Sequence, residues 1–436
     1  MARSLTTRDI HALMNQLVKE ATGQENSIQV VDSSSFISAG EQVLATGTEN
    51  TINSLSLVVG RSLMAVRPYG AKFNIINAID TGAYAHRIRK ISYYSRNAKP
   101  SGDWNTQLYT NLKGGYTNGQ NVVDGTAQST KSQWEQNPAV VLEMNFAGSS
   151  TWEDSTTVYE NQLKQAFRSE ADFAQFVSGI MTEKANDIES QKEAYNRVVL
   201  LNFIAGVYDM ASTGSVVNLT EAFNTEFNTN YTSAQLRTTY LKDFLAFMVA
   251  KIKIDSRMMT NRSLKNHWSP AKVVDEVPHY LLRHTPYDRQ RLLLHSPLIT
   301  KSESYVFPSL FNEKYLKIEN YEGVDFWQNE ANPASIDVVP AIPNKTTPAN
   351  GQIQGDEVKL DYLVGVLYDV DAMMTDYQLE GALSTPVEAR KRYRNIWWTF
   401  ARNGINDFTE NAIIYYMADP EPTPTPTPDT PDNGNS

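Results

Sequence analysis

The 436-residue chain contains no cysteine. Disulfide bonds, thiolate zinc sites, iron–sulfur clusters and cysteine nucleophiles are therefore excluded together. The sequence also lacks GxxxxGK and GxGxxG, so it carries no phosphate-binding loop of these two types, and it lacks the HExxH motif of zinc proteases. These absences remove the motifs that most often identify a nucleotide-dependent enzyme or a metalloprotease.

Basic charge is in the minority. Lys and Arg number 39 against 49 Asp and Glu, which gives a formal net charge of −10 at pH 7. Proteins that hold nucleic acid through its phosphates usually carry a basic excess, so that class is disfavoured. The 41% apolar and 20% charged residues are typical of a globular chain, long enough for about two to four packed units.

Long apolar runs are also missing. The longest, residues 198–207, is interrupted by Asn202 and is shorter than the roughly 20 residues that a membrane span needs. The N-terminal segment has no continuous apolar region of the kind found in a secretory signal. We therefore expect a soluble, acidic protein that is made inside the cell and has no membrane partner.

The N-terminal third reads as a helix, an arm and a hairpin. Apolar spacing predicts a short helix over residues 5–21, and the small polar residues 26–48 predict an extended arm. Residues 50–146 alternate with period two, and 114–125 contain both Asn-Gly and Asp-Gly, the strongest short-range hairpin signals. Residues 83–97 alternate as a half-exposed strand does, so we predict a long β-hairpin whose tip lies between about 100 and 136. It has too few large apolar residues to bury both of its faces.

The middle of the chain has helical spacing. It predicts helices over 155–168 and 170–208, and the second would span about 60 Å. Asn218, with Glu221 three residues later, predicts the start of a short helix. A further helix is expected over 233–253 and a buried strand at 292–294.

The C-terminal third is predicted to close with a strand, a helix and a strand. Residues 333–355 are rich in Pro, Gly and Asn and predict a long surface loop, before a strand over 360–370. The sequence Thr-Pro-Val-Glu at 385–388 is a helix-start signal, and we expect that helix to end near Arg402. A strand over 412–417 follows, and the Pro-Thr tail 419–436 cannot form a core.

Candidate reaction centres are few. Of six histidines, only His279 and His284 have a spacing near that of metal ligands, and we interpret them as ordinary surface or core residues. Asp369, Asp371 and Asp376 do not match an EF-hand, and although paired carboxylates serve glycosidases, we interpret them as solvated acids where a strand ends. We predict no catalytic residue, metal ligand or cofactor site, and a structural or assembly protein is favoured over an enzyme.

Basic and aromatic side chains supply the candidate contact residues. The basic side chains of residues 87–90 and 283–291 could contact phosphate, but on an acidic chain we expect them to contact acidic surfaces of neighbouring subunits. Trp397 and Trp398, predicted to lie on a helix, are interpreted as core residues rather than as a stacking platform for a base or sugar. The candidate inter-subunit contact residues are Arg87, Arg89, Lys90, Tyr93, Tyr94, Trp104, Trp134, Arg283, Arg289 and Arg291.

Three segments resemble a known family. YENQLKQAFRSEADFAQFVSGIM at 159–181 resembles the entry to a long spine helix, ESYVFPSLFNEKYLKIENYEGVDFW at 303–327 resembles an axial-domain segment, and STPVEARKRYRNIWWTFARNGINDFTENAIIYYM at 384–417 resembles the closing helix and strand. The family is that of tailed-bacteriophage major capsid proteins with the HK97-like fold, and the segments most resemble the capsid proteins of small short-tailed phages (podoviruses).

The resemblance implies an α+β fold with defined parts. These are an N-terminal arm (1–48), peripheral-domain strands (49–153) with a hairpin called the E-loop (about 83–138), a short helix and the spine helix (154–211), an axial domain (212–355), a return into the peripheral domain (356–418) and an extended tail (419–436).

The implied function is a shell subunit, not an enzyme and without a cofactor. It would assemble in the host bacterial cytoplasm, through hexamers and pentamers, into the icosahedral virion shell around double-stranded DNA. Implied partners are other copies of the chain, scaffold, portal and other virion proteins, with non-specific proximity to packaged DNA. Two alternatives stay open. One is another virion structural protein such as a tail sheath subunit. The other is a surface carbohydrate-binding or carbohydrate-hydrolysing module, because Pro-Thr tails often link such domains.

Overall fold

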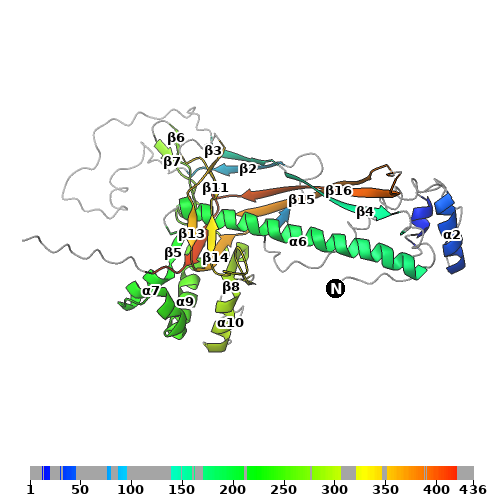
Figure 1. The fold of residues 1–436 in the computed structure, drawn as a ribbon. Coiled ribbons are helices and arrows are strands. Elements are labelled where there is room, and N and C mark those ends of the chain that lie inside the picture. Colours follow the sequence, from blue (N-terminus) through cyan, green and yellow to red (C-terminus); the bar gives the residue numbers. More distant parts are fainter. Residues whose placement is uncertain are drawn as a thin grey trace, which may run out of the picture. The chain divides into compact units, whose positions relative to one another are not determined.

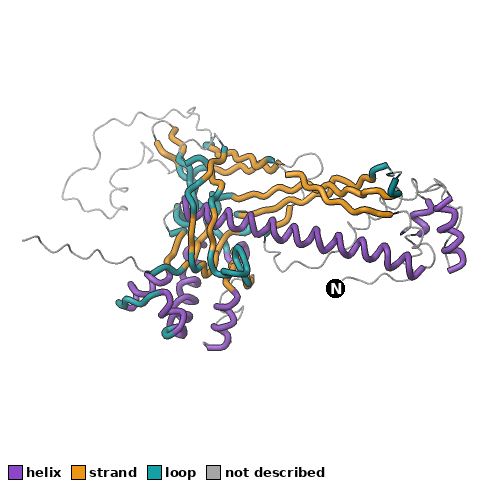
Figure 2. Tube along the Cα trace, viewed as in Figure 1, coloured by secondary structure: helices purple, strands orange, loops and turns teal. Residues whose placement is uncertain are grey.

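The chain divides into two compact units in the computed structural model (Figures 1 and 2). The first unit comprises residues 1–88, 146–268 and 283–436, and the second comprises 89–145 and 269–282. The structure describes residues 12, 14–19, 30, 33–45, 76–79, 87–95, 139–148, 150–159, 162, 170–210, 214–274, 277–305, 321–345, 351–386, 388 and 390–419.

The longest element of the first unit is helix α6 (Glu170–Met210), with 41 residues. It confirms the long helix predicted over 170–208, and at 1.5 Å per residue it extends for about 60 Å. Strands β15 (Met373–Ser384) and β16 (Tyr393–Asn406) run along it (Figure 1). Lys184 fixes the helix to the neighbouring strand β4 (Ser150–Tyr159), because its Nζ donates to the Asp154 carboxylate at 2.8 Å. Since only 8% of Lys184 is exposed, this ion pair is shielded from water.

A four-stranded sheet is formed in the order β1-β15-β16-β4, with β1 (Asn77–Ile79) at one edge. Strands β15 and β16 pair antiparallel as a long hairpin, β16 pairs antiparallel with β4, and β1 pairs parallel with β15. Along β16, Arg394, Ile396 and Trp398 are buried, while Trp397 between them is 39% exposed. This alternation places successive side chains on opposite faces, as in any strand with one covered face.

Two helices predicted from the sequence are strands of this sheet. The helix expected over 385–402 is wrong. Thr385 and Glu388 lie in the turn of the β15–β16 hairpin, where the Thr385 N–H donates to the Asn395 carbonyl (2.9 Å) and the Glu388 N–H donates to the Tyr393 carbonyl (3.0 Å). The helix expected over 155–168 is also wrong up to Tyr159, where β4 ends. Cross-strand pairing decided both segments against their local helix signals.

A five-stranded sheet forms the core of the first unit, in the order β5-β17-β14-β8-β9. Its strands are β5 (Val216–Asn218), β17 (Ala412–Tyr416), β14 (Leu363–Asp369), β8 (Gln290–His295) and β9 (Tyr321–Val324). Every residue of the central strand β14 is buried, as expected for a strand covered on both faces. The strands predicted around 292–294, 360–370 and 412–417 are confirmed.

The two faces of the five-stranded sheet carry different helices. On one face, Phe203 and Ile204 of α6 join a cluster with Leu293 and Val366. On the other face, α7 (Leu219–Phe227) and α9 (Leu241–Met259) form a second cluster that includes Leu292, Leu294, Leu367 and Ile413. The sheet is therefore the middle layer of a helix–sheet–helix arrangement.

The helices of the second face begin at capping side chains. The Asn218 side chain accepts from the Thr220 N–H at the start of α7, as predicted, and Thr232 forms a capping box with Gln235 at α8 (Ser233–Thr238). A break at Tyr240 separates α8 from α9, so the single helix expected over 233–253 is two helices. Helix α10 (Ser296–Tyr305) follows β8, which is preceded by the short 3-10 helix η1 (Tyr287–Arg289).

Residues 333–355 were predicted as a loop but contain short strands. Strand β10 (Ile336–Val338) pairs with β13 (Val358–Leu360). Strand β11 (Ala341–Pro343) pairs with β12 (Gln352–Gln354). Their proline and glycine residues lie at the ends of short strands, where they break no long ladder.

The extended arm expected over 26–48 contains helix α2 (Ser33–Ala45). Phe36, Ala39 and Val43 are fully buried, and their spacing of three and four residues places them on one side of the helix. A helical segment also occurs at 14–19, inside the helix predicted over 5–21. The prediction of an extended arm was wrong because this helix buries only a few, mostly small, apolar side chains, and so few gave no clear helical pattern.

The second unit is built from two small strand pairs. Strand β2 (Arg87–Tyr93) pairs with β3 (Val141–Ala147), and β6 (Lys272–Val274) pairs antiparallel with β7 (Val277–His279). Tyr94, Val140 and Leu281 form its buried cluster. The β2–β3 pair is the base of the predicted hairpin, whose tip between about 100 and 136 lies outside the described residues. No helix in the described part of the chain is long and apolar enough to cross a bilayer.

Candidate functional site

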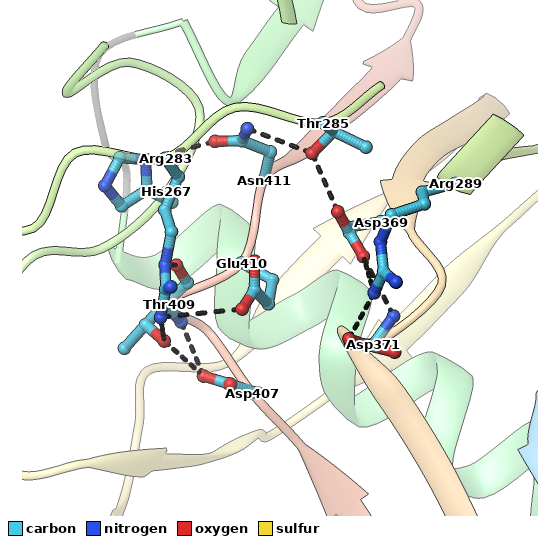
Figure 3. A network of polar contacts seen from close by, with 10 residues as sticks. All are labelled: His267, Arg283, Thr285, Arg289, Asp369, Asp371, Asp407, Thr409, Glu410 and Asn411. Carbon is cyan, nitrogen blue, oxygen red and sulfur yellow. Dashed lines mark hydrogen bonds and ion pairs between the residues drawn. The ribbon is translucent and has the colours of Figure 1, made fainter. Parts of the chain in front are cut away.

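A junction of polar side chains lies where the four-stranded sheet and the five-stranded sheet are joined (Figure 3). Residues 370–372 connect β14 to β15, and residues 407–411 connect β16 to β17. The two connections are hydrogen-bonded to each other, because the Asp407 N–H donates to the Ala372 carbonyl at 2.8 Å. The junction therefore fixes how one sheet continues into the other.

Asp369 is the central acceptor of this junction. It is 3% exposed, and its carboxylate accepts from Thr285 Oγ1 at 2.9 Å and from the Asp371 N–H at 3.0 Å. The Arg289 guanidinium approaches Asp369 at 3.5 Å and also pairs with Asp371. Partial burial lowers the pKa of Arg289, but the charges of Asp369 and Asp371 outweigh it, so the pKa is raised overall. Arg289 thus stays a cation and bridges the two aspartates.

Asn411 extends the junction to His267. Its side-chain amide donates to Thr285 Oγ1 at 3.1 Å, and its Oδ1 lies 3.1 Å from His267 Nδ1. The Lys265 carbonyl lies 3.0 Å from the same ring nitrogen. Because both of these partners are oxygen acceptors, Nδ1 carries the proton of the imidazole. Nδ1 of this buried ring is therefore engaged with the junction.

Arg283 closes the other side of the junction. Its guanidinium donates to the Thr409 carbonyl at 3.1 Å and to Thr409 Oγ1 at 3.2 Å, and it pairs with Glu410 at 3.5 Å. Thr409 in turn donates to Asp407 from its N–H at 2.9 Å and from its hydroxyl at 2.7 Å. The junction residues are thus occupied with one another.

The space beside the junction is too small for a substrate. The cavity that His267, Phe408 and Glu410 line has a volume of about 10 Å³, near the lower limit for one water molecule. In the described part of the chain, no three His, Asp or Glu side chains are grouped as metal ligands would be. The geometry of this junction is that of a structural lock.

The junction corrects the interpretation of the three aspartates. They were expected to be solvated, but Asp369 and Asp376 are 3% and 1% exposed. Only Asp371 has a well-exposed side chain, at 41%. No sequence signal identified Thr285, Asn411 or the segment 407–410 as partners, because they are far from Asp369 in the sequence.

The candidate contact residues of the basic segment lie in this region. Arg283 and Arg289 pair with acidic residues of their own chain, as described above. Arg291 donates to the carbonyls of Asp288 and Gln290, both at 3.0 Å. Their contact with a neighbouring subunit stays a prediction.

The candidate contact residues of the β2–β3 pair are divided by the strand alternation. Arg89 is exposed and pairs with Glu143 of β3 at 2.8 Å, and Tyr93 is 67% exposed. Tyr94 is buried, at 7%, and desolvation raises the pKa of its phenol. Lys90 is half-buried and Arg87 begins β2. Trp104 and Trp134 lie outside the described residues.

Apolar side chains missed by the sequence analysis form a patch on the face of the four-stranded sheet that points away from Trp398. It consists of Tyr159, Leu383, Tyr393 and Trp397, and we name it the outer sheet patch. Leu383 is 78% exposed and lies opposite Trp397, and Tyr159 lies opposite Tyr393 with ring centroids 5.9 Å apart. The sequence analysis missed this patch because it placed Trp397 and Trp398 on a helix. In a strand, successive side chains point to opposite faces, so Trp397 is exposed while Trp398 is buried.

Comparison with known proteins gives one family. The family described as Phi29-like phage major capsid protein matches residues 124–416. No curated protein matches the chain.

Solved structures from phages are similar to the chain at low identity. The capsid structure of Staphylococcus phage Andhra has 11% identity over 80% of this chain and 85% of that one, with a TM-score of 0.49. A structure of the head fiber and inner core protein gp22 of native bacteriophage P68 has 12% identity over 80% and 85%, with a TM-score of 0.47. The mature capsid of bacteriophage PhiM1 has 9% identity over 80% and 87%, with a TM-score of 0.39.

Proposed function

Because the chain belongs to the family of Phi29-like phage major capsid proteins, we propose that it builds an icosahedral shell of hexamers and pentamers around a double-stranded DNA genome. It is a major capsid protein of a tailed bacteriophage and a virion component that associates with copies of itself. The α+β, HK97-like fold expected from the sequence is confirmed with the family. The match over residues 124–416 is the observation that carries the proposal.

The parts of the molecule have roles in this proposal. Helix α6 is the spine helix, and the β2–β3 pair is the base of the E-loop. The four-stranded sheet is the peripheral domain and the five-stranded sheet is the axial domain. Segment 356–418 contributes strands to both sheets, β15 and β16 to the first and β14 and β17 to the second. The polar junction then holds the two domains in a fixed relation, as a shell tile requires.

We assign no catalysis to the chain. The junction offers no space for a substrate, and its charged side chains are paired with one another. The tail-sheath and carbohydrate-module alternatives lose support, because the matching family is one of capsid proteins. Assembly in the host cytoplasm, with scaffold and portal proteins as partners, belongs to the proposal.

The acidic charge fits a shell that encloses DNA without holding it. With a net charge of −10, the subunit repels phosphates, so packaged DNA stays mobile for release. Assembled shells are expected to bind DNA weakly and with little dependence on salt. Tight binding that falls steeply with rising salt would contradict this part of the proposal.

Self-assembly is the test of the proposed function. The full chain, expressed alone and with the other head proteins of its phage, is examined by light scattering and sedimentation. Species the size of pentamers, hexamers or closed shells would support the proposal. A monodisperse monomer at every concentration, with and without the head proteins, would contradict it.

A further inference from the structure

Helix α9 has an apolar side that is exposed in the chain. Ala250, Ile254 and Met258 follow one another at intervals of four residues and therefore lie on one side of the helix. Ile254 is 58% and Met258 is 50% exposed. Phe227 of α7, 52% exposed, contacts the ring of Phe247 at the N-terminal end of this side. We name Phe227, Ala250, Ile254 and Met258 the α9 outer face.

Basic side chains border the C-terminal end of the α9 outer face. Arg257 is adjacent to Met258, and Arg262 and Lys265 follow the end of the helix; all three are exposed. Leu264 between them adds further apolar surface, at 45% exposure. A convex apolar surface with a basic border fits a partner surface that is concave, partly apolar and acidic.

The chain itself carries such a concave surface. A cleft of about 510 Å³ opens between the middle of α6 and the segment that follows β9. This volume is within the range of about 300–1,000 Å³ typical of binding clefts. We name it the Glu193 cleft, and it is lined by Glu193, Arg197, Gly323, Val324, Asp325, Phe326, Glu330 and Pro333.

The charge of the Glu193 cleft is negative. Its lining contains the carboxylates of Glu193, Asp325 and Glu330 but only the guanidinium of Arg197. Arg197 is held by Glu193 at 3.2 Å and by the Phe326 carbonyl, and its guanidinium lies 3.9 Å from the centre of the Phe326 ring. Asp325 and Glu330 are exposed at the border of the cleft.

The two surfaces are on opposite sides of the five-stranded sheet. Helix α9 packs on the face that carries Leu292 and Leu294, whereas α6 and Trp327 pack on the face that carries Leu293. Within one chain the α9 outer face and the Glu193 cleft therefore cannot meet. A contact between them joins two copies through different surfaces, and repetition of such a contact generates a ring when the rotation between copies closes and an open filament when it does not.

We propose that the α9 outer face of one copy docks into the Glu193 cleft of a second copy. Ile254 and Met258 enter the cleft beside Phe326, while Arg257 and its basic neighbours lie against Asp325 and Glu330. The proposal rests on the proposed function, because the partner is another copy of a self-associating chain. Opposite charges at the border orient the copies as they approach.

A charge exchange tests the docking. The variants Arg257→Glu and Glu330→Arg each place like charges against each other, and each is expected to raise the critical concentration for assembly roughly tenfold. The double variant restores an ion pair of reversed sense and is expected to assemble within about twofold of the unchanged chain. Lys242→Glu is the matched control, since it lies on the same helix but is turned about 120° away from Ile254.

Thermal unfolding of each variant separates loss of docking from loss of folding. Two results would overturn the inference while leaving the proposed function intact. One is normal assembly of both folded single variants, and the other is a double variant no better than the singles. If the unchanged chain itself fails to assemble with or without the other head proteins, the proposed function fails instead.

The absence of cysteine allows a second test. Met258→Cys combined with Glu330→Cys is expected to form a ladder of covalent multimers with a flexible bis-maleimide in assembled particles. Lys242→Cys combined with Glu330→Cys is expected to give none above background. Cross-links from the thiol introduced on α9 to a different protein, or particles that form without a ladder, would show that the second copy is not the occupant.

Discussion

The two aspartates that share Arg289 differ in burial, and their removal is predicted to have very different effects. Asp369 has a side chain that is 4% exposed, whereas the Asp371 side chain is 41% exposed. Both pair with the same guanidinium. Asp369→Ala and Asp371→Ala therefore form a matched pair, in which the chemical change and the cation are the same and only the environment differs.

The magnitude follows from what each carboxylate satisfies. Loss of Asp369 leaves the Thr285 hydroxyl and the Asp371 N–H without their acceptor, at about 1–3 kcal/mol for each buried donor. Its pair with Arg289 adds less than a fully buried pair would, because Arg289 is 42% exposed. We expect Asp369→Ala to lower the free energy of unfolding by about 3 kcal/mol. Asp371→Ala loses only an exposed pair and is expected to cost less than about 1 kcal/mol.

Denaturant unfolding of the unassembled chain, followed by tryptophan fluorescence, measures both variants. Asp369→Asn retains an oxygen acceptor for Thr285 and is expected to fall between them. Equal losses from Asp369→Ala and Asp371→Ala would refute the reasoning. So would a loss below about 1 kcal/mol for Asp369→Ala, because the junction would then contribute no more than a surface ion pair.

Three further predictions concern the core and the pH range of stability. On α6, a Cβ at Gly206 would overlap the Phe408 ring, so Gly206→Ala should destabilise the fold by about 1–3 kcal/mol. A Cβ at Gly179 meets nothing within 4 Å, so Gly179→Ala should stabilise the fold by up to about 1 kcal/mol. Thermal unfolding compares the two variants. Burial raises the pKa of Tyr416 to about 12. Because the unfolded chain loses this proton near pH 10, the contribution of Tyr416 to stability should fall from about pH 10 to about pH 12. Unfolding across that range should show a smaller loss for Tyr416→Phe than for the unchanged chain, and equal losses would contradict the raised pKa of Tyr416. Trp398 is fully buried, so Trp398→Ala should lower the free energy of unfolding by about 3–5 kcal/mol. Trp397→Ala in the outer sheet patch should lower it far less in the same unfolding measurement. Equal losses would contradict the strand alternation.

The elements that were predictable from the sequence are those with strong and uninterrupted periodicity. Helix α6 and the central strand β14 are of this kind, because one is a long proline-free segment with helical spacing and the other a short apolar run. The Asn218 cap is local in the same sense, since its side chain satisfies an N–H two residues away. Such features need no knowledge of the remaining chain.

The errors lie where distant segments decide the structure. Residues 393–406 have aromatic residues at spacings that suit a helix or a strand, and pairing with β15 and with β4, more than 200 residues earlier, selects the strand. The junction has the same origin. Asp369 was noticed as an acid at a strand end, but its hydrogen-bond partner Thr285 lies 84 residues away. Only the topology of the two sheets brings these groups together.

Electron microscopy of particles formed by the full chain tests the central claim most directly. The account predicts closed shells, with six-fold and five-fold rings of the subunit, formed by the chain alone or with the other head proteins of its phage. Open tubes, or single subunits under all of these conditions, would contradict it.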